Sequence, residues 1–334
     1  MIELKAISRL APLAGNPSRF QPVLPELRPI PLKETAPRVL SVIFQGLEPI
    51  PGYRITRRLG QGGFGEVWSA TSPKGDNVAL KFIDSTGKQS TLIAQEIRMM
   101  RGIKDLRHPY FIRLHDICAA PPYIIIIMER ADGSLKDLYN IYHQETGLHV
   151  PSDHLLELME QAAEGLDYLA SLKLTSFSWA QGNVQHCDVK PSNLLILNDT
   201  VKIADFGLCT TAKRVGGMEG FRGTPPYAAP ELYFGLPTSR TDQYGLAVTY
   251  CELSIGPEAL VSNLRFDSIA YPGPGVDFGK LREAELPVIG RAMSEHWTDR
   301  YPSCREFVAA LKRAARGPRW APRIRSGAAA PVQA

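Results

Sequence analysis

The 334-residue chain lacks any run of about 18 apolar residues, so no membrane-spanning helix is expected. It also lacks an N-terminal charged stretch followed by an apolar one, so we expect no signal peptide. Cysteine is scarce: five are present, an odd number with no CxxC pair, which indicates neither a disulfide framework nor a zinc site. A reducing, cytoplasmic location is the resulting expectation.

Acidic residues are absent after Glu306, where six Lys and Arg residues follow. Because these six exceed the net charge of +4, the rest of the chain is slightly acidic, which is not typical of a nucleic-acid binder. We expect residues 314–334 to form a basic, disordered tail. The alternative is contact with an acidic partner or a membrane surface.

Proline is concentrated at the other end of the chain. Residues 1–52 hold nine of the 27 prolines, and four of these fall within residues 22–31. Since proline cannot continue a helix interior, we predict a proline-rich, mostly disordered N-terminal arm over residues 1–52.

The remaining pattern predicts an α+β fold with two lobes. Residues 53–130 contain strand-like segments and one helical stretch, and residues 131–313 are mostly helical. Apolar residues at helical spacing in the second lobe are Leu155, Leu158, Met159, Ala162, Ala163, Leu166 and Leu169. A cleft between two such lobes is a preferred place for a ligand.

A glycine-rich segment, GQGGFGEV at residues 60–67, lies between two strand-like segments. Glycine lets backbone N–H groups approach phosphate closely. The dinucleotide fold shares the GxGxxG spacing, but there the loop opens a helix, whereas GEVWSAT has a strand pattern. The segment therefore predicts a hairpin over a phosphate-bearing ligand, with a mere flexible turn as the alternative.

The next segment, VALKFI at residues 78–83, has a lysine inside an apolar strand. Strand alternation places Ala79 and Lys81 on one face. A lysine there needs an anionic partner or a route to water. Glu96 lies on the apolar stripe of the following helical stretch and is the candidate partner. A solvent-facing Glu96 with a snorkelling Lys81 is equally compatible with the pattern.

The most informative region is HCDVKPSN at residues 186–193, followed by two apolar segments separated by Asn198-Asp199. This dipeptide predicts a two-residue turn, and pairing outward from it brings Asn193 next to Asp205. Carboxylate and amide oxygens suit Mg²⁺. Lys190 supplies positive charge for a phosphoryl group, and Asp188 is free to accept a hydroxyl proton.

These motifs, in this order and spacing, resemble those of the eukaryotic-like (Hanks-type) Ser/Thr protein kinases of bacteria, from about Tyr53 to about Arg313. The resemblance implies the bilobal protein-kinase fold, with residues 53–130 and 131–313 as its lobes, and dependence on ATP and Mg²⁺. It assigns catalysis to Asp188, Lys190 and Asn193, and the metal to Asn193 and Asp205. It assigns ATP binding to Leu59, Gly60, Gln61, Gly62, Gly63, Phe64, Gly65, Glu66, Val67, Ala79, Lys81, Glu96, Met128, Glu129, Ala131 and Leu195.

The resemblance also implies a protein substrate that carries Ser or Thr. Lys190 and Thr224 occupy the positions at which Ser/Thr kinases differ from tyrosine kinases, and residues 223–231, GTPPYAAPE, resemble the end of an activation segment. In the family, Glu231 pairs with Arg300, Asp242 braces the catalytic loop, and a spine includes Met100, Leu114, His186 and Phe206.

One position departs from the family pattern. Cys187 stands where an Arg usually precedes the catalytic Asp and binds a phosphorylated activation segment. Regulation through such a phosphate is therefore in doubt. The alternative to an enzyme is a pseudokinase-like scaffold that only binds ATP, but Lys81, Asp188 and Asp205 are all present.

Overall fold

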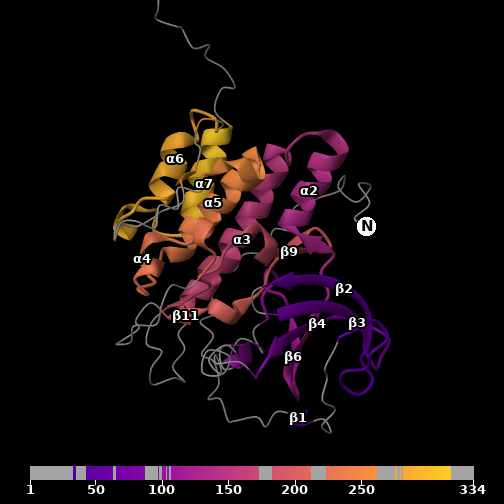
Figure 1. Ribbon diagram of the computed structural model, residues 1–334. Helices are drawn as coiled ribbons and strands as arrows, with labels where there is room; N and C mark the ends of the chain where they lie inside the picture. Colours follow the sequence, from indigo (N-terminus) through magenta and orange to yellow (C-terminus); the bar gives the residue numbers. More distant parts are fainter. Residues whose placement is uncertain are drawn as a thin grey trace, which may run out of the picture.

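The computed structural model describes residues 33–34, 43–62, 65–86, 97, 100–102, 104, 107–172, 183–211, 223–261, 275–276, 279 and 281–316. A twisted sheet forms one end of the molecule and a group of helices the other (Figure 1). The predicted α+β fold with two lobes is thus confirmed. Of the helices described, none combines the length and apolar character needed to cross a membrane.

The sheet of the smaller lobe has six strands in the order β1-β5-β6-β4-β3-β2. Every pair is antiparallel except β1 with β5. The strands are β1 (Lys33–Glu34), β2 (Arg54–Gly62), β3 (Gly65–Thr71), β4 (Asn77–Asp84), β5 (Leu114–Ala120) and β6 (Tyr123–Glu129). Residues with odd and even numbers in β4 face opposite sides: Val78, Leu80 and Phe82 join an apolar cluster on the outer face.

The N-terminal boundary differs from the prediction. Ile50 is buried, and Ile43 and Leu47 pack beside it against the outer face of the sheet. The backbone N–H of Ile55 donates to the carbonyl of Leu47, which fixes this segment to β2. Residues 43–52 therefore belong to the folded lobe and not to the predicted arm, because a bare apolar sheet face would be exposed without them.

The larger lobe is built around α3 (Ser152–Ser171) and α5 (Thr241–Ile255). The seven apolar residues predicted to share one face of α3 are all buried. Around them lie α2 (Leu135–Thr146), α4 (Pro230–Tyr233), α6 (Leu286–Ala292) and α7 (Cys304–Ala315). α7 begins at its cap Ser303 and runs two residues beyond the predicted end of the domain at residue 313.

Short strands and 3-10 helices lie before and between the helices of the larger lobe in chain order. β9 (Leu194–Leu197) and β10 (Thr200–Ile203) form the predicted hairpin, with Asn198 and Asp199 both at positive φ, as its two-residue turn requires. β7 (Gly133–Ser134) extends this hairpin. The remaining strands are β8 (Val184–Gln185), β11 (Thr210–Thr211), β12 (Leu260–Val261) and β13 (Gly275–Val276), and the 3-10 helices are η2 (Pro191–Asn193), η3 (Phe206–Leu208), η4 (Pro225–Tyr227), η5 (Pro257–Ala259) and η7 (Trp297–Asp299).

Candidate active site

The glycine-rich segment forms the tip of the β2–β3 hairpin, where Gly62 pairs with Gly65. Gly65 has φ +128, and a Cβ atom there would lie 1.8 Å from the carbonyl oxygen of Phe82. No other residue fits that position, because the strands approach too closely. Around the tip, the side chain of Arg58 contacts Gln61 and Glu66. Gly63 and Phe64 lie outside the described residues.

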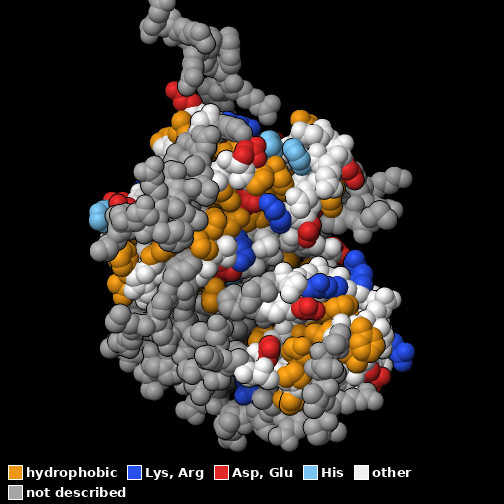
Figure 2. Space-filling model, in the orientation of Figure 1, with side chains coloured by type: hydrophobic (Ala, Val, Ile, Leu, Met, Phe, Trp, Pro, Cys, Tyr) orange, Lys and Arg blue, Asp and Glu red, His pale blue; other side chains and the backbone are white. Residues whose placement is uncertain are grey.

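Strand register gathers the residues predicted to bind the adenine. Val67 pairs with Lys81 across β3 and β4, and Ala79 pairs with Met128 across β4 and β6. Leu195, the predicted contact from the larger lobe, is half-buried on β9. Figure 2 shows a hollow between the two lobes. Leu59, on β2, is 39% exposed. Two further residues are predicted to contact the adenine. The backbone N–H of Glu129 donates to the carbonyl of Arg113, and Ala131 is half-buried.

Lys81 joins the two lobes. Its ammonium nitrogen lies 2.7 Å from Oδ1 of Asp205, although 124 residues separate the two in sequence. Burial alone would raise the pKa of Asp205, but the charge and hydrogen bond of Lys81 outweigh it, so the pKa is lowered and the carboxylate stays ionised at neutral pH. Glu96 lies outside the described residues, so its pairing with Lys81 stays a prediction.

Asp188 is the centre of a dense polar cluster and is almost fully buried. Its Oδ2 accepts from the Asn193 amide at 2.9 Å and lies 2.8 Å from the Lys190 ammonium. Its Oδ1 accepts from the hydroxyl of Thr224 at 2.7 Å, and Lys190 also donates to that hydroxyl at 2.6 Å. The four side chains thus hold one another in a fixed arrangement around a carboxylate.

The β9–β10 hairpin brings Asn193 and Asp205 together, as its turn predicted. The N–H of Ala204 donates to the carbonyl of Asn193 at 2.9 Å, which sets Asp205 beside it. Asn193 uses its amide nitrogen on Asp188, so its amide oxygen points the other way. A carboxylate and an amide oxygen at the end of one hairpin are hard oxygen donors, and this donor set fits Mg²⁺.

Asp242, buried at the start of α5, fixes the backbone of the catalytic loop. Its two carboxylate oxygens accept from the N–H groups of His186 and Cys187 at 2.7 and 2.8 Å. These bonds hold Cys187 at φ 65, a left-handed conformation that costs a non-glycine residue energy. Gly245 lets α5 come this close, because a Cβ there would lie 2.9 Å from the carbonyl of Val189.

The ring of His186 ties this loop to the strand end before Asp205. Its Nε2 lies 2.9 Å from the carbonyl of Ala204, and its Nδ1 accepts from the N–H of Asp188 at 3.3 Å. Since a carbonyl only accepts, we assign the proton to Nε2. The ring also packs edge-on against Phe206, at 5.5 Å between centroids. Asp205, at φ 64, is a second non-glycine residue in the left-handed region beside the catalytic cluster.

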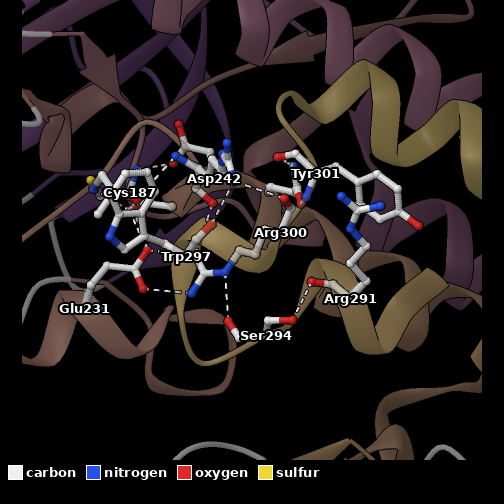
Figure 3. A network of polar contacts seen from close by, with 12 residues as sticks. Cys187, Glu231, Asp242, Arg291, Ser294, Trp297, Arg300 and Tyr301 are labelled. Atoms are coloured by element: carbon white, nitrogen blue, oxygen red, sulfur yellow. Dashed lines mark hydrogen bonds and ion pairs between the residues drawn. The ribbon is translucent and has the colours of Figure 1, made fainter. Parts of the chain in front are cut away.

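Figure 3 shows a further anchor, in which Arg300 reaches Glu231 at the start of α4. The fully buried guanidinium contacts both carboxylate oxygens, at 2.7 and 2.8 Å, and also donates to the carbonyl of Ser294. This is the pair that the family resemblance implies. It fixes the end of the segment that carries Thr224, and removal of one partner would leave a buried charge.

Sequence reasoning missed one feature of the site. Glu252, in the middle of α5, contacts both Lys136 and Tyr227, the latter only three residues after Thr224. The sequence pattern could have predicted this contact. Glu252 lies between Cys251 and Leu253 on a helix without a polar face, so its carboxylate must be buried and paired.

A two-lobed fold with a glycine hairpin, an interlobe Lys–Asp pair and a buried carboxylate among polar side chains is typical of the protein kinase class. The chain belongs to the protein kinase family, whose domain, described as "Protein kinase domain", matches residues 53–274. It is 29% identical over 279 residues to the serine/threonine-protein kinase PknF of Mycobacterium tuberculosis, over 78% of this chain and 56% of that protein.

Other relatives extend the comparison. The CBL-interacting protein kinase 4 of Oryza sativa subsp. japonica is 33% identical over 193 residues, or 55% of this chain and 40% of that protein. The crystal structure of the M. tuberculosis PknI kinase domain aligns with a TM-score of 0.60 at 24% identity, over 82% of this chain and 99% of that one. The chain spans about half the length of PknF. The predicted resemblance to bacterial Ser/Thr kinases is confirmed.

Proposed function

We propose that this protein is an active enzyme that transfers the γ-phosphate of ATP to a Ser or Thr hydroxyl of a protein substrate. The observation that carries the proposal is the cluster in which Asn193, Lys190 and Thr224 all contact the carboxylate of Asp188. An acceptor hydroxyl beside Asp188 would lose its proton to this carboxylate as its oxygen bonds to the γ-phosphorus and ADP leaves.

The nucleotide is assigned to the space between the glycine hairpin and β9. Gly60, Gly62 and Gly65 offer backbone N–H groups to the phosphates, and Lys81 adds a positive charge. Asn193 and Asp205 would hold Mg²⁺, which when bound supplies positive charge against the phosphate oxygens. Lys81 already neutralises Asp205 in part, so this pair also orients the carboxylate for the metal.

The substrate class rests on Lys190 and Thr224. Their contact at 2.6 Å places a lysine ammonium and a threonine hydroxyl beside Asp188. In the family that the chain resembles, a lysine and a threonine at these two positions distinguish Ser/Thr kinases from tyrosine kinases. The contact and this family pattern together support Ser/Thr specificity.

Regulation follows from the surroundings of Cys187. Its side chain packs in an apolar cluster with Ala228 and Leu232, both in the segment that ends at α4. The described members of this cluster include no basic side chain. We therefore propose that apolar packing, and not a phosphorylated residue, orders the contact between the catalytic loop and this segment.

The lower-ranked alternative is a pseudokinase-like scaffold. Against it stand Lys81, Asp188 and Asp205, each placed in a contact that catalysis needs. Four predictions remain proposals from the sequence: a mostly disordered N-terminal arm before residue 43 apart from β1, a basic tail after residue 316, a cytoplasmic location, and contact of the tail with an acidic partner or a membrane surface.

The experiment that tests the function incubates the purified chain with Mg²⁺, labelled ATP and a generic protein substrate, followed by phosphoamino-acid analysis. We expect label on serine and threonine, and none on tyrosine. A chain that binds ATP but transfers no phosphate would support the scaffold instead.

A further inference from the structure

Glu252 is an acid buried in the interior of α5, with only 2% of its surface exposed. Its two carboxylate oxygens are satisfied by two other elements. Oε1 accepts from the ammonium of Lys136 in α2 at 2.6 Å, and Oε2 accepts from the hydroxyl of Tyr227 in η4 at 2.5 Å. Each oxygen is thus engaged, and a basic side chain of a substrate would have to compete with Lys136 for this carboxylate.

This network leads directly to the catalytic cluster. The backbone N–H of Tyr227 donates to the carbonyl of Thr224 at 2.9 Å, so both belong to one tight turn. The hydroxyl of Thr224 contacts Asp188. An acceptor peptide that reaches Asp188 must pass this turn, and its flanking residues then lie near the outer end of the network.

Lys136 forms that outer end. Its side chain is 35% exposed, whereas that of Glu252 is 2% exposed. Its ammonium has three donors, and Glu252 occupies only part of that capacity. The group also lies 5.6 Å from the ring centre of Tyr139. Figure 2 shows Lys and Arg side chains reaching the surface in the hollow between α2 and the sheet.

The position of Lys136 in its helix is unfavourable without a partner outside that helix. It lies in the first turn of α2, which begins with a capping box between Ser134 and Asp137. The positive end of the helix dipole disfavours a cation there. The capping box fixes the turn, and Lys136 is held in place by Glu252 while about a third of its side chain, 35%, stays exposed.

Resting on the proposed kinase activity, we propose that Lys136 is a specificity-determining residue that favours protein substrates with an acidic side chain close to the acceptor Ser or Thr. An acidic side chain accepts from the exposed part of the ammonium. A basic side chain is repelled by the ammonium of Lys136 and must compete with that ammonium for the carboxylate of Glu252.

The test uses peptides with one Ser acceptor and with Glu, Ala or Arg at single positions within four residues on either side. Turnover is measured as kcat and KM, and binding by fluorescence anisotropy of the labelled peptides. At one or more positions we expect the wild type to prefer Glu over Arg by roughly tenfold, mainly through KM, because the contact lies away from the reacting atoms.

Two variants change the charge to different degrees. Lys136→Met should bring the Glu-to-Arg ratio to one or below, because it also frees Oε1 of Glu252 for a basic side chain, and Lys136→Glu should invert the ratio. Lys136→Met removes the charge while it keeps the apolar stem, so it serves if Lys136→Glu, placed beside Glu252, fails to fold. The matched control is Lys312→Glu, whose lysine forms an equally short 2.6 Å ion pair with Glu160 on another face, and it should keep the wild-type ratio.

Three outcomes would overturn the proposal: a wild type without preference, a wild type that prefers Arg, or a ratio that Lys136→Met leaves unchanged. Failure of the proposed function looks different, since then no peptide is phosphorylated by any variant. The anisotropy measurement needs no turnover and still reports whether Lys136 selects acidic peptides.

Discussion

The two halves of the active site are built differently. In the larger lobe, buried side chains bond to the backbone of the catalytic loop: Asp242 holds two N–H groups and His186 holds one N–H and one carbonyl. In the smaller lobe, strand pairing places Val67, Ala79 and Lys81. Several buried side chains thus fix the backbone of the proposed catalytic half, while strand pairing positions the described residues of the proposed nucleotide half, and Lys81 links them to Asp205.

The difference has a consequence for mutations. Loss of a brace in the catalytic half leaves buried polar groups without partners, which costs folding free energy as well as turnover. Loss of a side chain in the nucleotide half removes a contact to the ligand, while the strands that carry it remain paired. The predictions below separate these two effects.

The largest effect on turnover is expected at the centre of the catalytic half. Asp188→Asn removes the proton acceptor but keeps its shape, so kcat should fall roughly 10²-fold or more. Steady-state phosphorylation of a protein substrate measures the change, with thermal melting as the check on folding. Unchanged turnover in a folded variant would contradict the assignment of Asp188.

The next effect is on stability. Asp242→Ala leaves two buried N–H groups unpaired and should lower the free energy of unfolding by about 2–5 kcal/mol, with a loss of kcat. The matched control is Asp167→Ala, which removes a carboxylate that accepts from the N–H groups of Cys304 and Arg305 at 2.8 and 3.0 Å. The control should also lose stability in urea unfolding but keep its turnover per folded molecule. Equal loss of turnover in both variants would remove the special role of Asp242.

In the nucleotide half, Lys81→Met should weaken ATP binding by roughly 10- to 100-fold, the scale of one charge-assisted hydrogen bond. Without nucleotide, the melting temperature should fall only through the loss of the ion pair to Asp205, because the strands that carry residue 81 stay paired. Lys104→Met, which breaks a 2.9 Å ion pair with Asp116, is the control and should bind ATP like the wild type. Titration with a fluorescent nucleotide measures the dissociation constant of each variant and of the wild type.

A smaller effect is expected from dephosphorylation. Because Cys187 packs against Ala228 and Leu232, phosphatase treatment should change turnover by less than about twofold, unlike in kinases that use an Arg to bind the phosphate. A large loss would mean that another basic residue, such as Lys213 or Arg214, binds an activating phosphate.

The smallest effect is expected at Cys209. The family resemblance places the strand before Asp188 beside the strand after Gly207, which makes a regulatory Cys187–Cys209 disulfide one hypothesis and two reduced, packed cysteines the favoured alternative. β8 and β11 pair with Thr210 opposite Gln185, and Cys209 packs in the main core while Cys187 packs in the separate cluster with Ala228. Burial raises the pKa of the Cys209 thiol well above its usual range. At pH 8 the thiol is therefore protonated, and a protonated thiol is a poor nucleophile.

Two measurements follow. Iodoacetamide at pH 8 should label Cys209 in the native protein at less than roughly a tenth of its extent in urea, and Cys209→Ser should keep the wild-type sensitivity to oxidant. Rapid labelling, or protection from oxidant in Cys209→Ser, would reinstate the cysteine as a switch.

Much of this site could be predicted from local patterns. The Asn198-Asp199 turn fixed the register that brings Asn193 to Asp205, and strand alternation separated Lys81 from Leu80. The network of Lys136, Glu252 and Tyr227 could not be predicted in the same way, because it joins three elements whose relative placement depends on the packing of α2 and α5. The same is true of residues 43–52, in which apolar residues are interspersed with Gly and Pro in no helix or strand period that would show Ile50 covering the sheet.

The most direct test of the account is an experimental structure with Mg²⁺ and a non-hydrolysable ATP analogue. We expect the phosphates between the glycine hairpin and Lys81, the metal on the oxygens of Asn193 and Asp205, and the γ-phosphate facing Asp188. A nucleotide bound elsewhere, or a metal that touches neither Asn193 nor Asp205, would contradict the account.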